Sequence, residues 1–329
     1  MANGPAPDAN PPVEWSESKN IKWKVALPGE GSSTPVIWGD RIFLTAASSM
    51  GKPSASVSTS ASTQRPDTAQ PNPRGPGGDK GSPAVGGRRR GGGMFGIEKP
   101  TQPYRFMVLC LDRRTGKPLW ESVAREEVPH EGHHPTGTYA GASPVTDGQL
   151  VFVFFGSRGL HCFDLNGALL WQKDFGHMRT KNSFGEGSSP ALHGDTVVVN
   201  WDQEGDSFIT ALDKRTGKER WRQRRDEGTG WSTPLIIDHE GQAQVVVNAT
   251  GKVRGYDLAT GTLRWEAGGQ TANAIPSPVS ANGMVYVTSG FRGSTLQAIR
   301  LGKTGELTGT DAIAWRYDRD TPYVPSPLL

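Results

Sequence analysis

Short apolar runs separated by glycine-rich polar turns follow one another along most of this chain. Between Ser189 and Trp221, an apolar run at 196–199 follows a Gly-Asp pair, and a second run at 207–212 leads into the turn Asp-Lys-Arg-Thr-Gly at 213–217. Short runs of β-branched and apolar residues bounded by such turns are typical of buried strands. The stretch therefore predicts four short strands joined by tight turns.

The same pattern recurs along the chain as a Ser/Thr-Pro start, a central Gly, Leu-Asp-x-x-Thr-Gly and a closing Trp. The closing tryptophans are 51, 50, 44 and 50 residues apart, and they are Trp120, Trp171, Trp221, Trp265 and Trp315. In the first four units Trp follows the turn glycine by four residues, and these glycines are Gly116, Gly167, Gly217 and Gly261. This period is that of propeller blades, each a four-stranded antiparallel sheet. We therefore predict an all-β fold, a β-propeller.

Five complete units can be delimited after an irregular segment at 1–20. The units cover about 33–120, 143–171, 189–221, 232–265 and 277–315, and the start of a further unit lies at 323–329. A lone Trp-bearing strand at 21–26 and the incomplete last unit indicate a ring of eight blades, of which this chain carries a truncated arc from 21 to 329. The fifth unit lacks the turn Asp, and its Trp comes later, so we expect a longer hairpin there.

A segment rich in Ser, Pro, Gly and Arg interrupts the first unit at 48–102. It has too little apolar surface to offset the entropy of ordering, so we expect a disordered insertion. Residues 51–100 hold eight Lys/Arg and three Asp/Glu, and the resulting positive net charge of this segment exceeds the net charge of +3 of the whole chain. No general basic field therefore favours nucleic acid. The tract GGRRRGGG at 86–93 could touch RNA or an acidic surface, and a solvated loop is the interpretation that we favour.

The two cysteines, Cys110 and Cys162, occupy equivalent positions in neighbouring units. Repeat geometry would hold them apart, which predicts two separate buried thiols rather than a disulfide. No apolar run approaches the ~18 residues that a membrane span needs. The first residues, MANGPAPDANPP, lack the apolar segment of a signal peptide. We therefore expect neither a membrane span nor, in this chain, a signal peptide.

Leu-Asp-x-x-Thr-Gly-x-x-x-Trp, in register with Ser-Pro-Val-x-x-x-Gly-x-Val-x-Val, resembles the pyrroloquinoline-quinone-type (PQQ-like) repeat over roughly 20–329 apart from the insertion. Families with this repeat include quinoprotein dehydrogenases, which bind PQQ and calcium at the mouth of an eight-bladed ring. They also include the lipoprotein of the outer-membrane β-barrel assembly machinery, a binding scaffold without cofactor. Segments such as FGEGSSP and GWSTP are most similar to a third group, PQQ-binding-like propellers of the bacterial envelope. The resemblance implies a periplasmic or secreted protein, and an N-terminus truncated before this chain begins.

Resemblance to quinoprotein dehydrogenases would imply a catalytic Asp, a calcium-binding set of Glu and Asn, and a Cys-Cys disulfide over the cofactor. No Cys-Cys pair is present, and the repeated Asp residues fall in the blade turns, where a structural role explains them, at Asp112, Asp164, Asp213 and Asp257. We therefore expect no catalytic residue, no PQQ and no calcium. A quinoprotein oxidoreductase whose site lies partly in missing blades remains the alternative.

The one histidine cluster is PHEGHHP at 129–135, with His130, His133 and His134. Three histidines within five residues could ligate a transition metal. Adjacent histidines normally point in different directions, so exposed imidazoles on a polar loop are the interpretation that we favour.

The loops that enter the inner strands should line one face of the ring, where propellers commonly bind. The aromatic and amide residues in these loops are Tyr139, Phe184, Trp231, Asn273 and Tyr323. Such groups around a funnel suit a peptide, a sugar or an extended segment, and packing against neighbouring loops is the alternative for each residue. We predict a non-catalytic scaffold of the bacterial envelope that binds a protein or carbohydrate, with Trp231 as the best single candidate.

Overall fold

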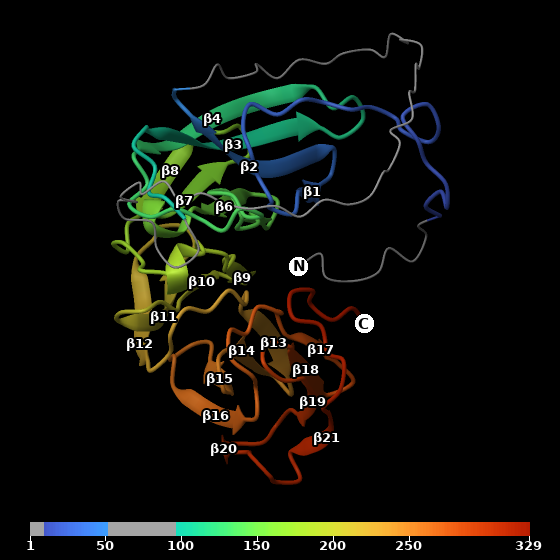
Figure 1. Cartoon of the computed structure of the whole chain (residues 1–329), viewed down its shortest axis with the longest axis vertical. Coiled ribbons are helices and arrows are strands. Elements are labelled where there is room, and N and C mark those ends of the chain that lie inside the picture. The colour runs from blue at the N-terminus through green and yellow to red at the C-terminus, as the bar shows by residue number, and fades with distance from the viewer. Residues whose placement is uncertain (1–9, 52–96) are drawn as a thin grey trace, which may run out of the picture.

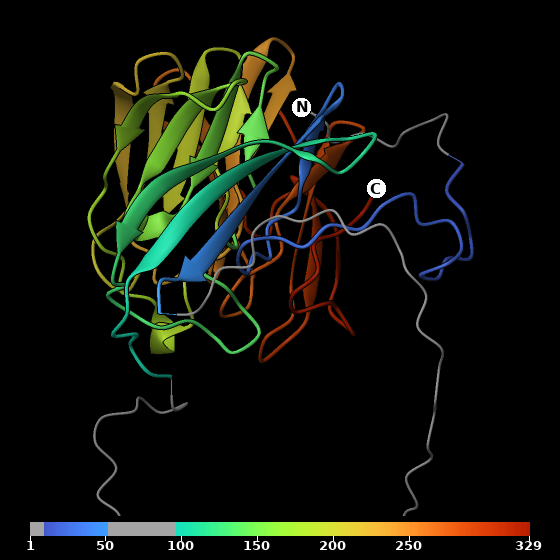
Figure 2. The same cartoon turned by 90° about the horizontal axis from the view of Figure 1, so that it is seen from above.

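The computed structural model describes residues 10–51 and 97–329. Five sheets follow one another along the described chain and lie in an arc around a common centre (Figure 1). Each has four antiparallel strands, and one of them gains a short fifth strand that pairs in parallel. Figure 2 shows the sheets of successive blades side by side. The predicted all-β propeller fold is therefore confirmed, while the complete ring of eight blades stays a prediction.

The strands of each blade follow the chain from the centre of the arc outward. Blade 1 contains β1 (Val36–Trp38), β2 (Arg41–Ser49), β3 (Tyr104–Asp112) and β4 (Pro118–Glu127). Blade 2 contains β5 (Val145–Thr146), β6 (Leu150–Phe154), β7 (Leu160–Asp164) and β8 (Leu169–Lys173). Blade 3 contains β9 (Ala191–His193), β10 (Thr196–Trp201), β11 (Ser207–Asp213) and β12 (Glu219–Arg225).

The last two blades share one extra strand. Blade 4 contains β13 (Leu235–His239), β14 (Gln242–Asn248), β15 (Lys252–Asp257) and β16 (Leu263–Gly268). Blade 5 contains β17 (Val279–Ala281), β18 (Met284–Ser289), β19 (Thr295–Arg300) and β21 (Ile313–Tyr317), and the short β20 (Gly305–Glu306) pairs with β16. Two short 3₁₀ helices, η1 (Gly156–Arg158) and η2 (Lys181–Ser183), lie in loops.

The repeated turn joins the third and fourth strands and binds the tryptophan of the preceding blade. In blade 3, Asp213 Oδ1 accepts hydrogen bonds from the backbone N–H groups of Arg215 at 3.1 Å and Thr216 at 3.0 Å, and Gly217 has a φ of 67°. The indole of Trp171 from blade 2 lies on that glycine and donates to the Lys214 carbonyl at 3.0 Å. The turn therefore offers both a left-handed glycine and an acceptor for the preceding tryptophan.

The same contact joins the other neighbouring blades of the first four. Trp120 donates to the Leu165 carbonyl at 2.8 Å, and Trp221 donates to the Leu258 carbonyl at 2.8 Å. Most of the core accordingly lies between blades, because four apolar clusters each combine strands of two neighbouring sheets, while a fifth joins blade 1 to Val25 and Leu27 of the segment before it.

A ladder of hydroxyl groups joins the blades at the centre of the arc. The residue before each inner-strand proline donates its backbone N–H to the hydroxyl of the equivalent residue in the next unit, at 2.9–3.1 Å. The links are Thr34 to Ser143, Ser143 to Ser189, Ser189 to Thr233, Thr233 to Ser277 and Ser277 to Ser326. The prolines thus open the inner strands as predicted, and the small hydroxyl residue beside each one is a link between blades.

Two predicted flanking strands are wrong, because neither 21–26 nor 323–329 forms a strand. A strand needs a neighbour to satisfy its backbone groups, and no strand of the described chain pairs with either segment. Trp23 nevertheless lies on Gly116 and donates to the Arg113 carbonyl at 3.0 Å, as the blade tryptophans do. The segment keeps the side-chain contact of the repeat without its backbone pairing.

The first-blade insertion starts later than predicted. Ser48 and Ser49 belong to β2, where they pair with Arg105 and Tyr104 of β3. The middle of the predicted insertion, 52–96, lies outside the described residues.

The longer hairpin predicted in blade 5 is confirmed, and it changes the role of the neighbouring tryptophan. Residues 301–312, including β20, separate β19 from β21. Trp265 therefore has no Asp-x-x-Thr-Gly turn to lie on, and it donates to Gln244 Oε1 of its own blade at 2.7 Å. Trp315 on the last outer strand is 44% exposed and lies beside Tyr286.

The two cysteines are buried free thiols in blades 1 and 2, as predicted. Burial raises the pKa of Cys110 to about 11 and that of Cys162 to about 12. Neither of the helices in the described part of the chain is long or apolar enough to span a bilayer.

Candidate functional site

A cavity of about 960 Å³ lies at the centre of the arc, and loops that precede inner strands form much of its wall. Four of the five residues predicted from the sequence line it, namely Phe184, Trp231, Asn273 and Tyr323. Phe184, Trp231 and Asn273 come from three different connections between blades and Tyr323 follows the last blade, so the fold brings together side chains that are far apart in the sequence.

Trp231 is held in place on the cavity wall by the neighbouring loop. Its Nε1 donates to the Gly185 carbonyl at 2.8 Å, and the ring rests against Gly187, where an added Cβ would lie 2.9 Å from Cδ1. The side chain remains half-buried. A fixed indole on a cavity wall can offer a flat apolar face to a ligand at little entropic cost.

The other predicted aromatic residues of the wall also lie against neighbours. Phe184 meets the ring of His134 edge-on, with centroids 5.2 Å apart. Tyr323 stacks on Phe291, with centroids 5.1 Å apart and an interplanar angle of 29°. Phe291, in the loop between β18 and β19, was not predicted, because we considered only the loops that enter inner strands.

Asn273 anchors a lysine on the wall. Its side chain is 5% exposed, and its Oδ1 accepts a hydrogen bond from Lys181 Nζ at 2.9 Å. Its backbone has a φ of 55°, and left-handed conformations also occur at Asn182 (54°) and Arg292 (54°) around the same cavity. Such conformations are costly for residues other than glycine and concentrate at functional sites.

Two cations on the wall, Lys181 and Arg292, were missed by the sequence interpretation. Neither forms an ion pair with another described residue, and the Arg292 guanidinium lies 5.3 Å from the centre of the Phe291 ring. Each lies within a few residues of a loop aromatic, but this spacing does not show that both face one cavity. Their convergence on one cavity depends on the arc itself.

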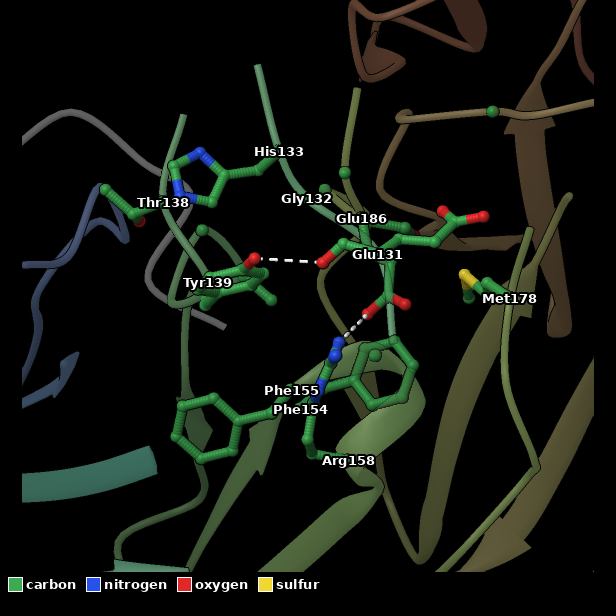
Figure 3. A pocket seen from close by; sticks show the side chains of 17 residues that line it. Glu131, Gly132, His133, Thr138, Tyr139, Phe154, Phe155, Arg158, Met178 and Glu186 are labelled. Atoms are coloured by element: carbon green, nitrogen blue, oxygen red, sulfur yellow. Dashed lines mark hydrogen bonds and ion pairs between the residues drawn. The ribbon is translucent and has the colours of Figure 1, made fainter. Parts of the chain in front are cut away.

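Tyr139, the fifth predicted residue, does not line this cavity but a neighbouring pocket of about 20 Å³ (Figure 3). Its hydroxyl donates to the Glu131 carbonyl at 2.9 Å, and its ring meets His133 edge-on at 4.5 Å. Burial raises the pKa of this phenol. Tyr139 thus packs against neighbouring loops, as the alternative interpretation of these residues expected.

The same small pocket contains a buried ion pair (Figure 3). Arg158 is 4% exposed, and its guanidinium lies 3.4 Å from Glu186 Oε2 and 3.1 Å from Glu127 Oε1. Glu186 also accepts hydrogen bonds from the backbone N–H of Ser157 at 2.8 Å and from its hydroxyl. The charge of Glu186 is therefore balanced within the protein.

The three clustered histidines have three different partners. His130 Nε2 lies 2.6 Å from the Met178 carbonyl, and its ring stacks on His177 with centroids 4.4 Å apart. The His133 ring faces Tyr139, and His134 Nδ1 lies 2.8 Å from Thr136 Oγ1. In this arrangement the three imidazoles do not converge on one point.

The donors of the cavity do not fit a calcium-bound quinone. Glu186 is the only carboxylate among the residues that line the large cavity, and it already has its partners. The described residues contain no group of three or more His, Cys, Asp and Glu able to hold a metal ion. Asp112, Asp164, Asp213 and Asp257 cap the turns at the opposite end of the blades. Calcium sites are built around carboxylate ligands, and the one carboxylate of the described wall is already held by Arg158 and Ser157.

Known proteins were compared with this chain in sequence and in structure. No curated protein matches the sequence significantly. BamB from Moraxella catarrhalis has a solved structure that is similar, with 20% identity, a TM-score of 0.46, and coverage of 66% of this chain and 60% of that chain. Quinohemoprotein alcohol dehydrogenase from Comamonas testosteroni is similar with 13% identity, a TM-score of 0.44, and coverage of 64% and 40%.

The chain thus spans 60% of the length of the first of these structures and 40% of the second. The family model described as outer membrane protein assembly factor BamB matches residues 105–314, which is more than half of the chain. That region runs from β3 to β21 and contains most of the cavity wall. The chain therefore belongs to the PQQ-like repeat family that is described as outer membrane protein assembly factor BamB.

Proposed function

We propose that this chain is a non-catalytic scaffold of the bacterial envelope that binds a protein or carbohydrate ligand in its central cavity. The observation that carries the proposal is the convergence of Phe184, Trp231, Asn273 and Tyr323 on one cavity of about 960 Å³. Ligand sites are typically concave, of roughly 300–1,000 Å³, with aromatic walls and a few placed polar groups. The cavity has these properties.

The wall is also suited to binding because its groups are held in position. Trp231 is tied to Gly185, and Asn273 is tied to Lys181 and Thr250. Fixed side chains lose little freedom when a ligand arrives, so more of the contact energy appears as affinity. The blades supply this rigidity, because each loop leaves and enters strands of a packed sheet.

The family description supports the location in the envelope, since it names an outer membrane protein assembly factor. The donor set of the described cavity supports a role without PQQ or calcium, because its one carboxylate already pairs with Arg158. A PQQ- and calcium-dependent oxidoreductase is the competing proposal. It predicts quinone absorbance and dye reduction after PQQ and calcium are added to the protein, and that result would overturn the scaffold proposal.

The direct test compares two tryptophan variants on arrayed oligosaccharides and peptides. Trp231→Ala removes the fixed indole of the cavity, while Trp315→Ala removes a tryptophan that is 44% exposed on the outer strand β21. We expect Trp231→Ala to weaken binding of any retained ligand by about tenfold or more, as for a central aromatic anchor, and Trp315→Ala to leave it unchanged. Equal binding by the wild type and Trp231→Ala would refute the central cavity as the site.

A further inference from the structure

The described wall of the central cavity carries an uncompensated positive charge. Lys181 and Arg292 have no acidic partner among the described residues, and Glu186, the one acidic residue of the wall, is paired with the buried Arg158. Two cations facing a concave space raise the local concentration of anions, because field lines concentrate in clefts with low-dielectric walls. A ligand that carries negative charge is therefore favoured over a neutral one.

The two cations are placed rather than freely mobile. Lys181 belongs to η2 before blade 3, and its Nζ donates to Asn273 Oδ1 at 2.9 Å, which leaves other N–H donors of the ammonium group for a ligand. Arg292 lies in blade 5, with its guanidinium over the Phe291 ring. The Lys181 ammonium group thus reaches the connection between blades 4 and 5, and Ala272 of that connection forms a β-bridge with Phe291, the neighbour of Arg292, so one ligand can contact both cations.

Aromatic side chains line the same cavity as these cations. Trp231, Phe184, Phe291 and Tyr323 all line the cavity. The apolar C–H faces of sugar rings stack on such side chains, while their hydroxyl groups hydrogen-bond to amides and hydroxyls, here Asn182, Asn273, Thr136 and Thr138. A sugar chain with acidic groups would use the aromatic faces and the cations together.

A peptide strand finds less to bind at the same place. A peptide that adds to a sheet needs free backbone donors and acceptors along an edge. The residues that open the inner strands, Ser143, Ser189, Thr233 and Ser277, already donate their backbone N–H groups to hydroxyls of the next unit. The hydroxyl ladder thus uses the backbone donors at the start of each inner strand. A ligand in the cavity would therefore be recognised mainly by side chains.

We infer that the ligand of the central cavity is an anionic glycan, a segment of sugar chain with carboxylate or sulfate groups that contacts both Lys181 and Arg292. This inference rests on the proposed function and names the chemical class of its ligand. Each cation forms charge-assisted hydrogen bonds with the acidic groups, and the aromatic faces hold the sugar rings between them.

Titration calorimetry with oligogalacturonate tests the inference, because its methyl ester keeps the sugar backbone and removes the charge. We expect the acid form to bind at least tenfold more tightly than the ester, with an affinity that falls as salt rises. A sulfated galactan oligomer in a second arm distinguishes sulfate from carboxylate as the preferred group. An oligoglutamate of similar length in a third arm tests an acidic peptide.

Charge-removing variants locate the effect on the cavity wall. Lys181→Met and Arg292→Met should each weaken binding of the acidic sugar by about three- to tenfold, a range set by partly exposed charge-assisted contacts. They should weaken binding of the ester less, so that the preference for the acid form falls. Lys218→Met is the matched control, because Lys218 is exposed in the turn at the opposite end of blade 3. It should change neither affinity, and circular dichroism should show that all three variants are folded.

Three results would overturn the inference. Equal binding of the acid and the ester would refute the role of charge, while loss of that binding in Trp231→Ala would still support the cavity as a sugar site. Binding of oligoglutamate but of no sugar would refute the glycan and leave a protein-binding scaffold. Binding of neither sugars nor oligoglutamate would refute the anionic ligand, and the array comparison of Trp231→Ala would then decide the proposed function separately.

Discussion

Replacing Gly217 with alanine measures what the contact between a turn glycine and the tryptophan of the preceding blade contributes to stability. Gly217 has a φ of 67°, a conformation that costs a residue with a Cβ about 1–2 kcal/mol. The added Cβ would lie 2.6 Å from Cε3 of Trp171, so the indole has to move. That movement weakens its 3.0 Å hydrogen bond to the Lys214 carbonyl, which contributes about 1 kcal/mol. We expect Gly217→Ala to lower the free energy of unfolding by about 2–4 kcal/mol, taking some lost packing into account.

Gly194→Ala in the same blade is the matched control. Its φ is 53°, but no atom lies within 4 Å of the added Cβ, so only the backbone cost of about 1–2 kcal/mol remains. Equilibrium unfolding in urea, followed by circular dichroism, gives both values. In a Trp171→Ala background the cost of Gly217→Ala should fall to that of Gly194→Ala, because the clash is gone. Equal costs for the two glycine variants in the wild-type background would refute the reasoning.

Two further predictions concern buried groups. Asp202→Asn removes one partner of an ion pair with Arg225 in which both side chains are 0% exposed, so the free energy of unfolding in urea should fall by about 3–5 kcal/mol. Arg224→Gln, which breaks an exposed ion pair, is the control and should lower it by less than about 1 kcal/mol. Similar losses in both variants would contradict this prediction. Burial raises the pKa of Cys110 to about 11 and that of Cys162 to about 12, so the thiolates form only near those pH values. A disulfide-exchange dye at pH 8 should therefore label two thiols in the unfolded protein and none in the folded protein. Rapid labelling of the folded protein would show that the thiols are accessible.

The fold could be predicted from the sequence because local rules set its repeated parts. Asp213, Gly217 and Trp171 each have a role that follows from residue type and spacing, namely a turn cap, a left-handed backbone and a large face between sheets. The same logic fails at 21–26. There the periodic Trp23 predicts a strand, but backbone pairing needs a partner strand that the described chain does not provide.

The candidate site was predicted in part, because its composition depends on how the blades are arranged in space. Trp231 and Asn273 could be chosen, since they directly precede inner strands that the repeat identifies. Lys181 and Arg292 could not be, because nothing in the linear pattern shows that a loop before blade 3 and a loop within blade 5 face the same cavity. Tyr139 stands at a position similar to that of Trp231, yet its hydroxyl is bonded to the Glu131 carbonyl and its ring contacts His133, so it lines the small pocket and not the large cavity.

The hydroxyl ladder has a consequence for how such a protein can change in evolution. Each unit offers one backbone donor and one hydroxyl acceptor at the same position, so every joint uses the same chemistry whatever its neighbours contain. Duplication or loss of a whole unit by recombination would create a new joint of the same kind, and the loops above could then diverge freely. The contact between neighbouring units at the centre of the arc is therefore the same throughout, and this allows the number of blades and the chemistry of the binding face to evolve separately.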